Sequence, residues 1–260
     1  MLTTYTQTSF AHDGETRPVY VRGHGPAVIV IHEIPGITPE VIRFADWVVD
    51  AGFRVYMPEL LGQAGKPLTT PYVLSSMMKL CIRREFHILA SNRSSPVTVW
   101  LRALARHAHD EAGGKGVGAV GMCFSGNFAL SMMMEPALLA PVLSQPSMPF
   151  PAGAARKAAL HVSPEELQCV KDRCAKGAKV LGLRFKGDFL SPPEKFETLR
   201  RELGDAFEGI EIDDKHANPD SPAPKPHSVL TVDLIDRDGE PTKEAAKRVI
   251  AFFQERLKAA

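Results

Sequence analysis

The sequence predicts an α/β protein built on one open, mostly parallel sheet. Three observations indicate this class: strand patterns alternate with helix patterns, the links between them are short, and residues 27–31 are five apolar residues in a row. An apolar run of this length is typical of a strand that is buried on both faces of a parallel sheet. Alternating strands and helices with short links favour a parallel sheet covered by helices.

Capping residues mark the helices of the first half. Thr38 is suited to be an N-cap and Pro39 to be the first helical residue, so we expect a helix that ends at Gly52. Ser95 and Pro96 repeat this pattern before a second helix. Strands are expected around these helices at residues 19–22, 53–57 and 117–121.

The second half continues the same order. Residues 163–166, Ser-Pro-Glu-Glu, combine an N-cap, a first-turn proline and a capping box. Strands are expected at 138–143, 180–185 and 210–212, and helices at 124–134, 163–177, 193–203 and 242–257. Residues 62–71 and 215–226 are irregular, and long irregular loops in a compact domain tend to be functional or mobile.

Length and composition favour one globular domain over residues 1–260. The chain is 44% hydrophobic and balances 31 Lys and Arg against 30 Asp and Glu, for a net charge of +1. This composition excludes a disordered chain and a polybasic nucleic-acid binder. A net charge near zero permits either a monomer or a small homo-oligomer.

The cysteines and the apolar patterning indicate a cytoplasmic protein. The four cysteines, at 81, 123, 169 and 174, form no C-x-x-C pair, metal-finger spacing or dense disulfide framework, as expected in the reducing cytosol. The N-terminus shows no basic-then-apolar signal, and no 18 apolar residues are consecutive. We therefore expect neither secretion nor a membrane partner.

Residues 116–121 match the glycine pattern G-x-G-x-x-G of dinucleotide-binding proteins. That pattern has to follow a strand and open a helix, with an acidic residue about 20 positions later. Here the glycines lie within the predicted strand, and position 141 is Pro. The sequence therefore predicts no nucleotide cofactor.

Residues 121–126 read Gly-Met-Cys-Phe-Ser-Gly, the form of a strand-to-helix elbow that carries a nucleophile, with Cys123 in place of the usual serine. Gly121 and Ser125 are small, which lets the strand and helix approach closely. A helix N-terminus would stabilise a thiolate and a developing oxyanion. The alternatives are a buried structural cysteine and, less suited by its neighbours, Ser125 as the nucleophile.

An elbow of this type needs an acid and then a histidine later in the chain. Asp188 follows the predicted strand 180–185, at the sheet edge where active sites of open α/β sheets lie. His227 precedes the C-terminal helix and is preferred as the base over His216. An aspartate that caps a turn and a solvated loop histidine are the alternative interpretations.

The loop after strand 27–31 is expected to complete the site. In the elbow architecture it supplies one oxyanion-binding N–H, here from Ile34, beside the N–H of Phe124. Glu33 places a carboxylate near the thiol. This carboxylate could hold the thiol in its neutral form, orient it, or simply be solvated. Gly36 stands where the zinc motif H-E-x-x-H requires its second histidine, so no metal is expected.

Together these residues resemble the dienelactone hydrolases (carboxymethylenebutenolidases), cysteine members of the α/β-hydrolase fold, over most of the chain. The resemblance is carried by His32-Glu33-Ile34-Pro35-Gly36, Phe53-Arg54-Val55-Tyr56-Met57-Pro58-Glu59-Leu60 and Gly121-Met122-Cys123-Phe124-Ser125-Gly126, and more weakly by Gly187-Asp188 and His227. It implies a sheet with helices on both faces. It also implies that Cys123 attacks an ester or lactone carbonyl, that His227 is the base oriented by Asp188, and that Glu33 interacts with the resting thiol.

Departures from the family pattern bear on the substrate. The family elbow usually has glycine where Ser125 stands, and members that cleave dienelactone bind its carboxylate with arginines, one of them at the position of Thr231 here. Arg84, with Arg83, could meet an anionic substrate, although a basic pair on a helix is often a solvated face. The segment 144–177 is longer than the usual connection and is expected to shape a lid.

The sequence thus predicts a hydrolase for a small ester, lactone or thioester that works through a thiol acyl-enzyme and needs no metal or organic cofactor. Its partner is a small-molecule substrate. The alternative function is a small-molecule binding or sensing module of the same fold that lacks catalysis.

Overall fold

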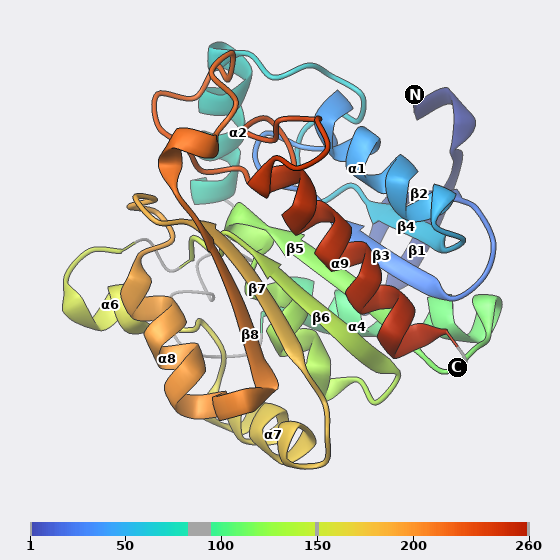
Figure 1. The fold of residues 1–260 in the computed structure, drawn as a ribbon. Helices are drawn as coiled ribbons and strands as arrows, with labels where there is room; N and C mark the ends of the chain where they lie inside the picture. Colours follow the sequence, from blue (N-terminus) through green and yellow to red (C-terminus); the bar gives the residue numbers. More distant parts are fainter. Residues whose placement is uncertain (1, 83–94, 149–150, 259–260) are drawn as a thin grey trace.

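The structure is a computed structural model that describes residues 2–82, 95–148 and 151–258, with the backbone alone for 79–82. Within these residues, eight strands form one sheet in the order β1-β2-β4-β3-β5-β6-β7-β8 (Figure 1). The strands are β1 (Thr6–His12), β2 (Glu15–Arg22), β3 (Ala27–Ile31), β4 (Arg54–Pro58), β5 (Val117–Met122), β6 (Leu138–Ser144), β7 (Val180–Phe185) and β8 (Phe207–Ile212). β1 and β2, and β2 and β4, pair antiparallel, and all other neighbours are parallel. The predicted open, mostly parallel sheet is confirmed.

Helices cover both faces of the sheet (Figure 1). They are α1 (Pro39–Asp50), α2 (Thr70–Ile82), α4 (Pro96–Ala112), α5 (Phe128–Ser131), α6 (Ala154–Ala158), α7 (Pro164–Ala175), α8 (Pro193–Leu203) and α9 (Pro241–Leu257). α1 and α9 pack on one face, and α4, α5, α7 and α8 pack on the other. This arrangement is the α/β-hydrolase fold that the resemblance implies.

The apolar run of β3 follows from burial on both faces of the sheet. Ala27, Ile29 and Ile31 belong to the core on the α4 side, and Val28 and Val30 belong to the core under α1 and α9. All five side chains are fully buried. A central parallel strand therefore shows no alternation of polar and apolar residues.

The register between β3 and β5 brings together the two loops from which the site is expected. Ile31, the last residue of β3, pairs with Gly121 near the end of β5. Both strands run in the same direction, so the residues after them emerge at the same edge of the sheet. The loop that starts at His32 and the turn that starts at Cys123 are thus neighbours.

The N-terminal hairpin was not expected from the sequence. β1 is an edge strand with mostly exposed side chains, so it lacks an apolar pattern. It joins β2 through Asp13 and Gly14, which both have positive φ, 49° and 79°. Asp-Gly is a strong signal for a tight hairpin turn, so this dipeptide could have indicated the strand.

Residues 124–134, expected as one helix, form a short turn, the four-residue α5 and a second short turn. Two polar side chains of this segment bond outside it. Asn127 Nδ2 donates to the Met148 carbonyl at 2.8 Å, and Ser131 Oγ donates to Glu166 Oε1 at 2.6 Å. Polar side chains can compete in this way with a continuous helix, and the expectation of a single helix is wrong.

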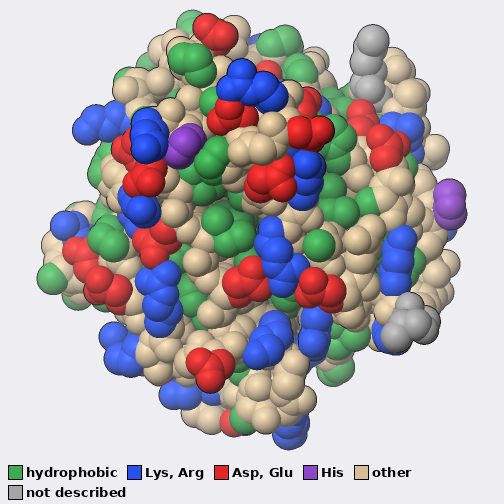
Figure 2. All heavy atoms as spheres, in the orientation of Figure 1, with side chains coloured by type: hydrophobic (Ala, Val, Ile, Leu, Met, Phe, Trp, Pro, Cys, Tyr) green, Lys and Arg blue, Asp and Glu red, His purple; other side chains and the backbone are tan. Residues whose placement is uncertain are grey.

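The surface agrees with the balanced charge of the sequence. Acidic and basic side chains are interspersed over the face that carries α1 and α9 (Figure 2). On α9, Arg248 lies 2.8 Å from Glu208 and 2.9 Å from Glu255. In the described parts of the chain, no helix is both long and apolar enough to cross a membrane.

A buried histidine joins the loop after β3 to the loop after β4. His32 Nε2 accepts hydrogen bonds from the backbone N–H groups of Leu60 and Leu61, at 3.0 and 3.3 Å. Its Nδ1 donates to the carbonyl of Glu33 at 2.8 Å. Burial lowers the pKa of His32 to about 4, so the ring is neutral at physiological pH and can accept at Nε2.

Replacing His32 by Leu removes the acceptor of two buried N–H groups, and we expect a loss of about 2–4 kcal/mol in the free energy of unfolding. Urea denaturation at pH 7 measures this loss. The exposed His24→Leu variant is the control and should change the value by less than about 0.5 kcal/mol. Because only the unfolded chain is protonated at His32 between pH 6.5 and about 4, wild type should also lose stability over that window, and His32→Leu should lose less.

Candidate active site

The turn after β5 is strained and tightly packed. Cys123 has a φ of 56°, in the left-handed region that costs a non-glycine residue about 1–2 kcal/mol. A Cβ atom at Gly121 would lie 2.1 Å from the Ser125 carbonyl oxygen, and one at Gly126 would lie 2.5 Å from the Pro146 Cα. Glycine is therefore required on both sides of the cysteine, as the elbow motif predicts at position 121.

Ser125 holds this turn against β3. Its Oγ accepts a hydrogen bond from the Met122 N–H at 2.9 Å and lies 3.2 and 3.1 Å from the carbonyls of Ile31 and His32, to which it can donate. The side chain is fully buried. Such a hydroxyl has no access to a substrate, which speaks against the alternative nucleophile that the sequence left open.

The structure brings Asp188 and His227 together beside Cys123. His227 Nδ1 lies 2.7 Å from Asp188 Oδ2, and Asp188 Oδ1 accepts from the Leu190 N–H at 3.0 Å. Ser147 Oγ lies 3.4 Å from both Cys123 Sγ and His227 Nε2. The thiol, imidazole and carboxylate thus form one connected group at the carboxyl ends of β5 and β7.

A second aspartate holds the loop that carries His227. Asp233 Oδ2 accepts hydrogen bonds from the backbone N–H groups of His227 and Ser228, at 2.8 and 2.7 Å. His216, the competing histidine, lies in the short turn after β8 and does not line the pocket at Cys123. The geometry therefore favours the histidine that the sequence analysis preferred.

The electrostatics of His227 favour its protonated form. Burial acts to lower its pKa, but the charges and hydrogen bonds of Cys123 and Asp188 outweigh burial and raise the pKa well above 6.5. Only 15% of the His227 side chain and 1% of the Asp188 side chain are exposed, so water screens this interaction weakly. The site can hold an imidazolium beside the sulfur atom.

Glu33 is buried and bonded to three neutral side chains. Its carboxylate accepts hydrogen bonds from Thr231 Oγ1, from Ser228 Oγ at 2.7 Å and from Gln145 Nε2 at 3.2 Å. Burial raises the pKa of Glu33, against the hydrogen bond from Thr231 and the positive charge of His227. In the described structure these bonds tie Glu33 to the loop of His227 rather than to the thiol.

A cavity of about 280 Å³ opens at the thiol. Ile34 and Phe124, from which the oxyanion-binding N–H groups are expected, both line it beside Cys123. The remaining wall comes mainly from α2 with the residues before it, and from residues 222–224. Leu68 and Thr70 belong to the first irregular stretch, 62–71, and residues 222–224 belong to the second, 215–226. Val73 and Met77 lie beyond the first stretch, on α2.

The other predicted substrate contacts have less structural support. Arg83 and Arg84 lie outside the described residues. Of the described part of the expected lid, 144–177, Ser147 lines the cavity, and α7 packs near α5 on the sheet face. The lid and the role of Arg84 therefore stay predictions.

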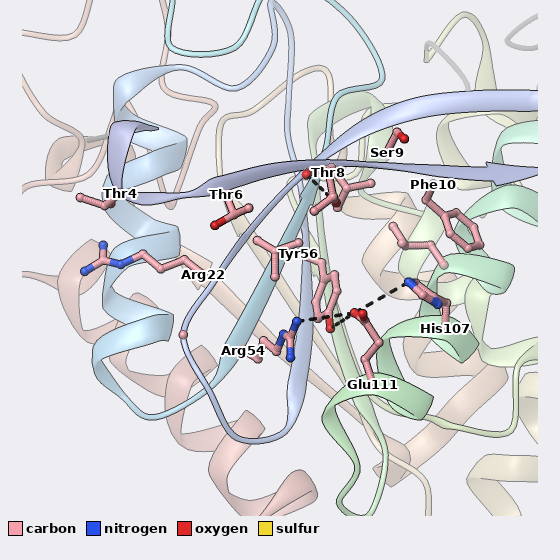
Figure 3. A pocket seen from close by; sticks show the side chains of 14 residues that line it. Thr4, Thr6, Thr8, Ser9, Phe10, Arg22, Arg54, Tyr56, His107 and Glu111 are labelled. Atoms are coloured by element: carbon pink, nitrogen blue, oxygen red, sulfur yellow. Dashed lines mark hydrogen bonds and ion pairs between the residues drawn. The ribbon is translucent and has the colours of Figure 1, made fainter.

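A larger pocket of about 620 Å³ lies between β1, the start of β4 and α4 (Figure 3). Three polar side chains of this pocket contact the Glu111 carboxylate. The Tyr56 hydroxyl donates to Glu111 Oε2 at 2.8 Å, and Arg54 Nη2 and His107 Nε2 lie 3.6 and 3.7 Å from the same oxygen. None of the predicted site residues lines this pocket. Among the described residues, no cluster of three or more His, Cys, Asp or Glu suits a metal ion there or elsewhere.

A buried lysine supports the segment that carries Ser147. Lys195 of α8 is fully buried, and its Nζ donates to the carbonyls of Met148 and Ala159, at 2.8 and 3.1 Å. Burial lowers the pKa of Lys195 to about 7. The pKa of the neighbouring His161 is lowered to about 3, by burial first and by the charge of Lys195 second. The Lys195 amino group thus fixes the backbone immediately after Ser147.

The chain matches the family model of the dienelactone hydrolase family over residues 16–151. The match covers half of the chain and contains the loop after β3 and the elbow at Cys123. The chain belongs to the dienelactone hydrolase family. As a member of this family it is a hydrolase.

Solved structures of dienelactone hydrolases have the same fold. A Klebsiella pneumoniae protein that carries the provisional name dienelactone hydrolase is 21% identical, with a TM-score of 0.63 over 96% of this chain and 98% of that one. The dienelactone hydrolase of Anabaena variabilis is 14% identical, with a TM-score of 0.62 over 98% and 100%. The metagenomic dienelactone hydrolase-like phosphotriesterase P91 is 16% identical, with a TM-score of 0.62 over 98% and 99%. A search of the curated proteins found no match.

Lys195 should make the stability of this dienelactone hydrolase family member depend on pH in the alkaline range. Between pH 10.5 and about 7 the unfolded chain binds a proton at Lys195 and the folded chain does not, so stability falls as the pH drops. We expect wild type to lose up to about 1.4 kcal/mol per pH unit relative to Lys195→Met between pH 9 and pH 7.5. Urea denaturation measures the slope, and the exposed Lys176→Met variant is the control. Parallel slopes for wild type and Lys195→Met would contradict the prediction.

Proposed function

We propose that the protein hydrolyses a small ester, lactone or thioester through an acyl-enzyme on Cys123. His227 takes the thiol proton, and the sulfur atom attacks the substrate carbonyl carbon. The oxygen of the tetrahedral intermediate accepts hydrogen bonds from the backbone N–H groups of Ile34 and Phe124. When the intermediate collapses, the C–O or C–S bond of the leaving group breaks and the His227 imidazolium protonates the leaving group.

Hydrolysis of the acyl-enzyme follows in a second step. His227 takes a proton from water as the water oxygen attacks the thioester carbonyl, and the same N–H groups bind the new oxyanion. The bond to Cys123 then breaks, the acid leaves, and the thiol recovers its proton. Both steps use protein groups and water alone.

Asp188 acts through His227 in this scheme. The 2.7 Å contact with Nδ1 supports a tautomer whose Nε2 is directed to the sulfur, and the carboxylate stabilises the imidazolium that forms. This contact, together with the position of Ser147 Oγ at 3.4 Å from both reacting atoms, is the observation that carries the proposal.

Three further groups act as positioning residues. Ser147 Oγ lies 3.4 Å from both the thiol and the imidazole and can hold the two groups in register for proton transfer. Glu33 binds Ser228, the residue after the base, and Asp233 binds the backbone of His227. In this proposal Glu33 orients the loop that carries His227. The family resemblance implies a different role for Glu33, a direct contact with the resting thiol.

Replacing Cys123 by Ala should lower turnover of activated esters such as 4-nitrophenyl acetate by at least about 1,000-fold without unfolding the protein, because a methyl side chain cannot form the acyl-enzyme. Intact-mass measurement after rapid mixing should find an acetyl adduct on wild type and none on the variant. Cys169→Ala is the matched control and should behave like wild type. A folded Cys123→Ala protein that retains turnover would refute the thiol mechanism. A wild-type protein with neither adduct nor turnover on any of a panel of esters, lactones and thioesters would favour the non-catalytic binding module.

Replacing Asp188 by Asn should lower the pKa of His227, because a neutral amide removes the charge that raises it. The imidazole C–H proton of His227 should titrate well above pH 6.5 by NMR in wild type and at a lower pH in Asp188→Asn. We also expect kcat/KM to fall about 100-fold or more. An unchanged His227 titration would contradict the proposed pair.

A further inference from the structure

Apolar side chains form most of the cavity above Cys123. Leu68, Val73 and Met77 line it from α2 and the residues before it, and Leu190, Pro222 and Val232 line it from the loops around Asp188 and His227. Its volume of about 280 Å³ lies at the small end of ligand pockets. The shape and lining suit a short, apolar acyl group.

The ionisable groups of the cavity are already engaged. Among the described lining residues there is no lysine or arginine, and Glu33 and His227 are the charged groups beside the thiol. Glu33 is bonded to Thr231, Ser228 and Gln145, and His227 is bonded to Asp188. A carboxylate on the acyl group would lose its water, meet apolar side chains and lie near Glu33, with no described cation to pair with it.

The apolar wall is fixed to the loop that carries Ile34. Ser76 of α2 is buried, and its Oγ donates to the Pro35 carbonyl at 3.2 Å. At the start of the helix, the Tyr72 hydroxyl accepts from the Gln63 N–H at 2.5 Å. These bonds fix the part of α2 whose Val73 and Met77 line the same cavity as Ile34 and Cys123.

We infer that the substrate of the Cys123 site is uncharged and carries a short apolar acyl group. A carboxylated lactone such as dienelactone is then a poor substrate. This inference rests on the proposed function and adds the chemical class of the acyl group to it.

The first experiment compares acyl groups on a common 4-nitrophenol leaving group. From acetate to butanoate, kcat/KM should rise about fourfold per methylene, the gain expected for burying each CH₂ group. The half-ester 4-nitrophenyl hydrogen hexanedioate should react at least fortyfold more slowly than its methyl ester, which lacks the charge and has one more methyl group. About fourfold of that difference is expected from the methyl group and the rest from the charge. Equal or faster reaction of the charged ester would overturn the inference, and loss of that reaction in Arg84→Ala would identify the cation responsible. Intact-mass detection of an adduct on Cys123 shows whether the proposed function itself holds. If the proposed function fails, no adduct forms with any ester, whereas a wrong acyl-group inference leaves the adduct in place.

The second experiment places a cation in the wall. Met77→Arg should raise the ratio of kcat/KM for the charged half-ester to that for its methyl ester by at least tenfold. Met78→Arg is the matched control, because Met78 is on the same helix, is 57% exposed and does not line the cavity. Its ratio should stay within twofold of wild type. An unchanged ratio in folded Met77→Arg would show that the acyl group lies elsewhere and would overturn the inference. The comparison of esters on wild type does not depend on either variant folding.

Discussion

The turn after β5 and the end of β3 approach so closely that one small hydroxyl group connects them. Ser125 Oγ bonds to Met122 and lies within reach of the carbonyls of Ile31 and His32, where it is fully buried. This contact holds Cys123 in a left-handed conformation that the chain would not adopt alone. Because the turn is held there, the sulfur atom points toward the cavity, and the loop with Glu33 and Ile34 lies beside it.

The rest of the site is assembled on this frame by buried polar groups. His32 joins the loops after β3 and β4, Asp233 holds the backbone of His227, and Lys195 holds the carbonyl after Ser147. Each of these groups bonds backbone atoms rather than other charges. A network of this kind restricts loop conformations, since a displaced loop would leave buried donors or acceptors unpaired.

The fold and the chain order of the candidate triad could be predicted because they depend on local patterns. Apolar runs, capping residues and the sequence around Cys123 are each readable within a few positions, and Asp188 follows a recognisable strand. Ser147 and Asp233 were missed because their importance arises only when β6, β7 and the last loop come together in the fold. The choice between His227 and His216 needed the same long-range information. The exposed β1 lacks an apolar pattern, and only its Asp-Gly turn could have revealed it.

The cavity wall and the groups proposed to react come from different parts of the chain. Val73 and Met77 lie on α2, a helix outside the sheet, whereas the thiol, imidazole and carboxylate lie on loops that the strands hold. Substitutions on α2 can therefore change which acyl group is accepted while the reacting atoms keep their positions. Under the proposed function, the helix that selects the acyl group is thus separate from the loops that carry out the chemistry.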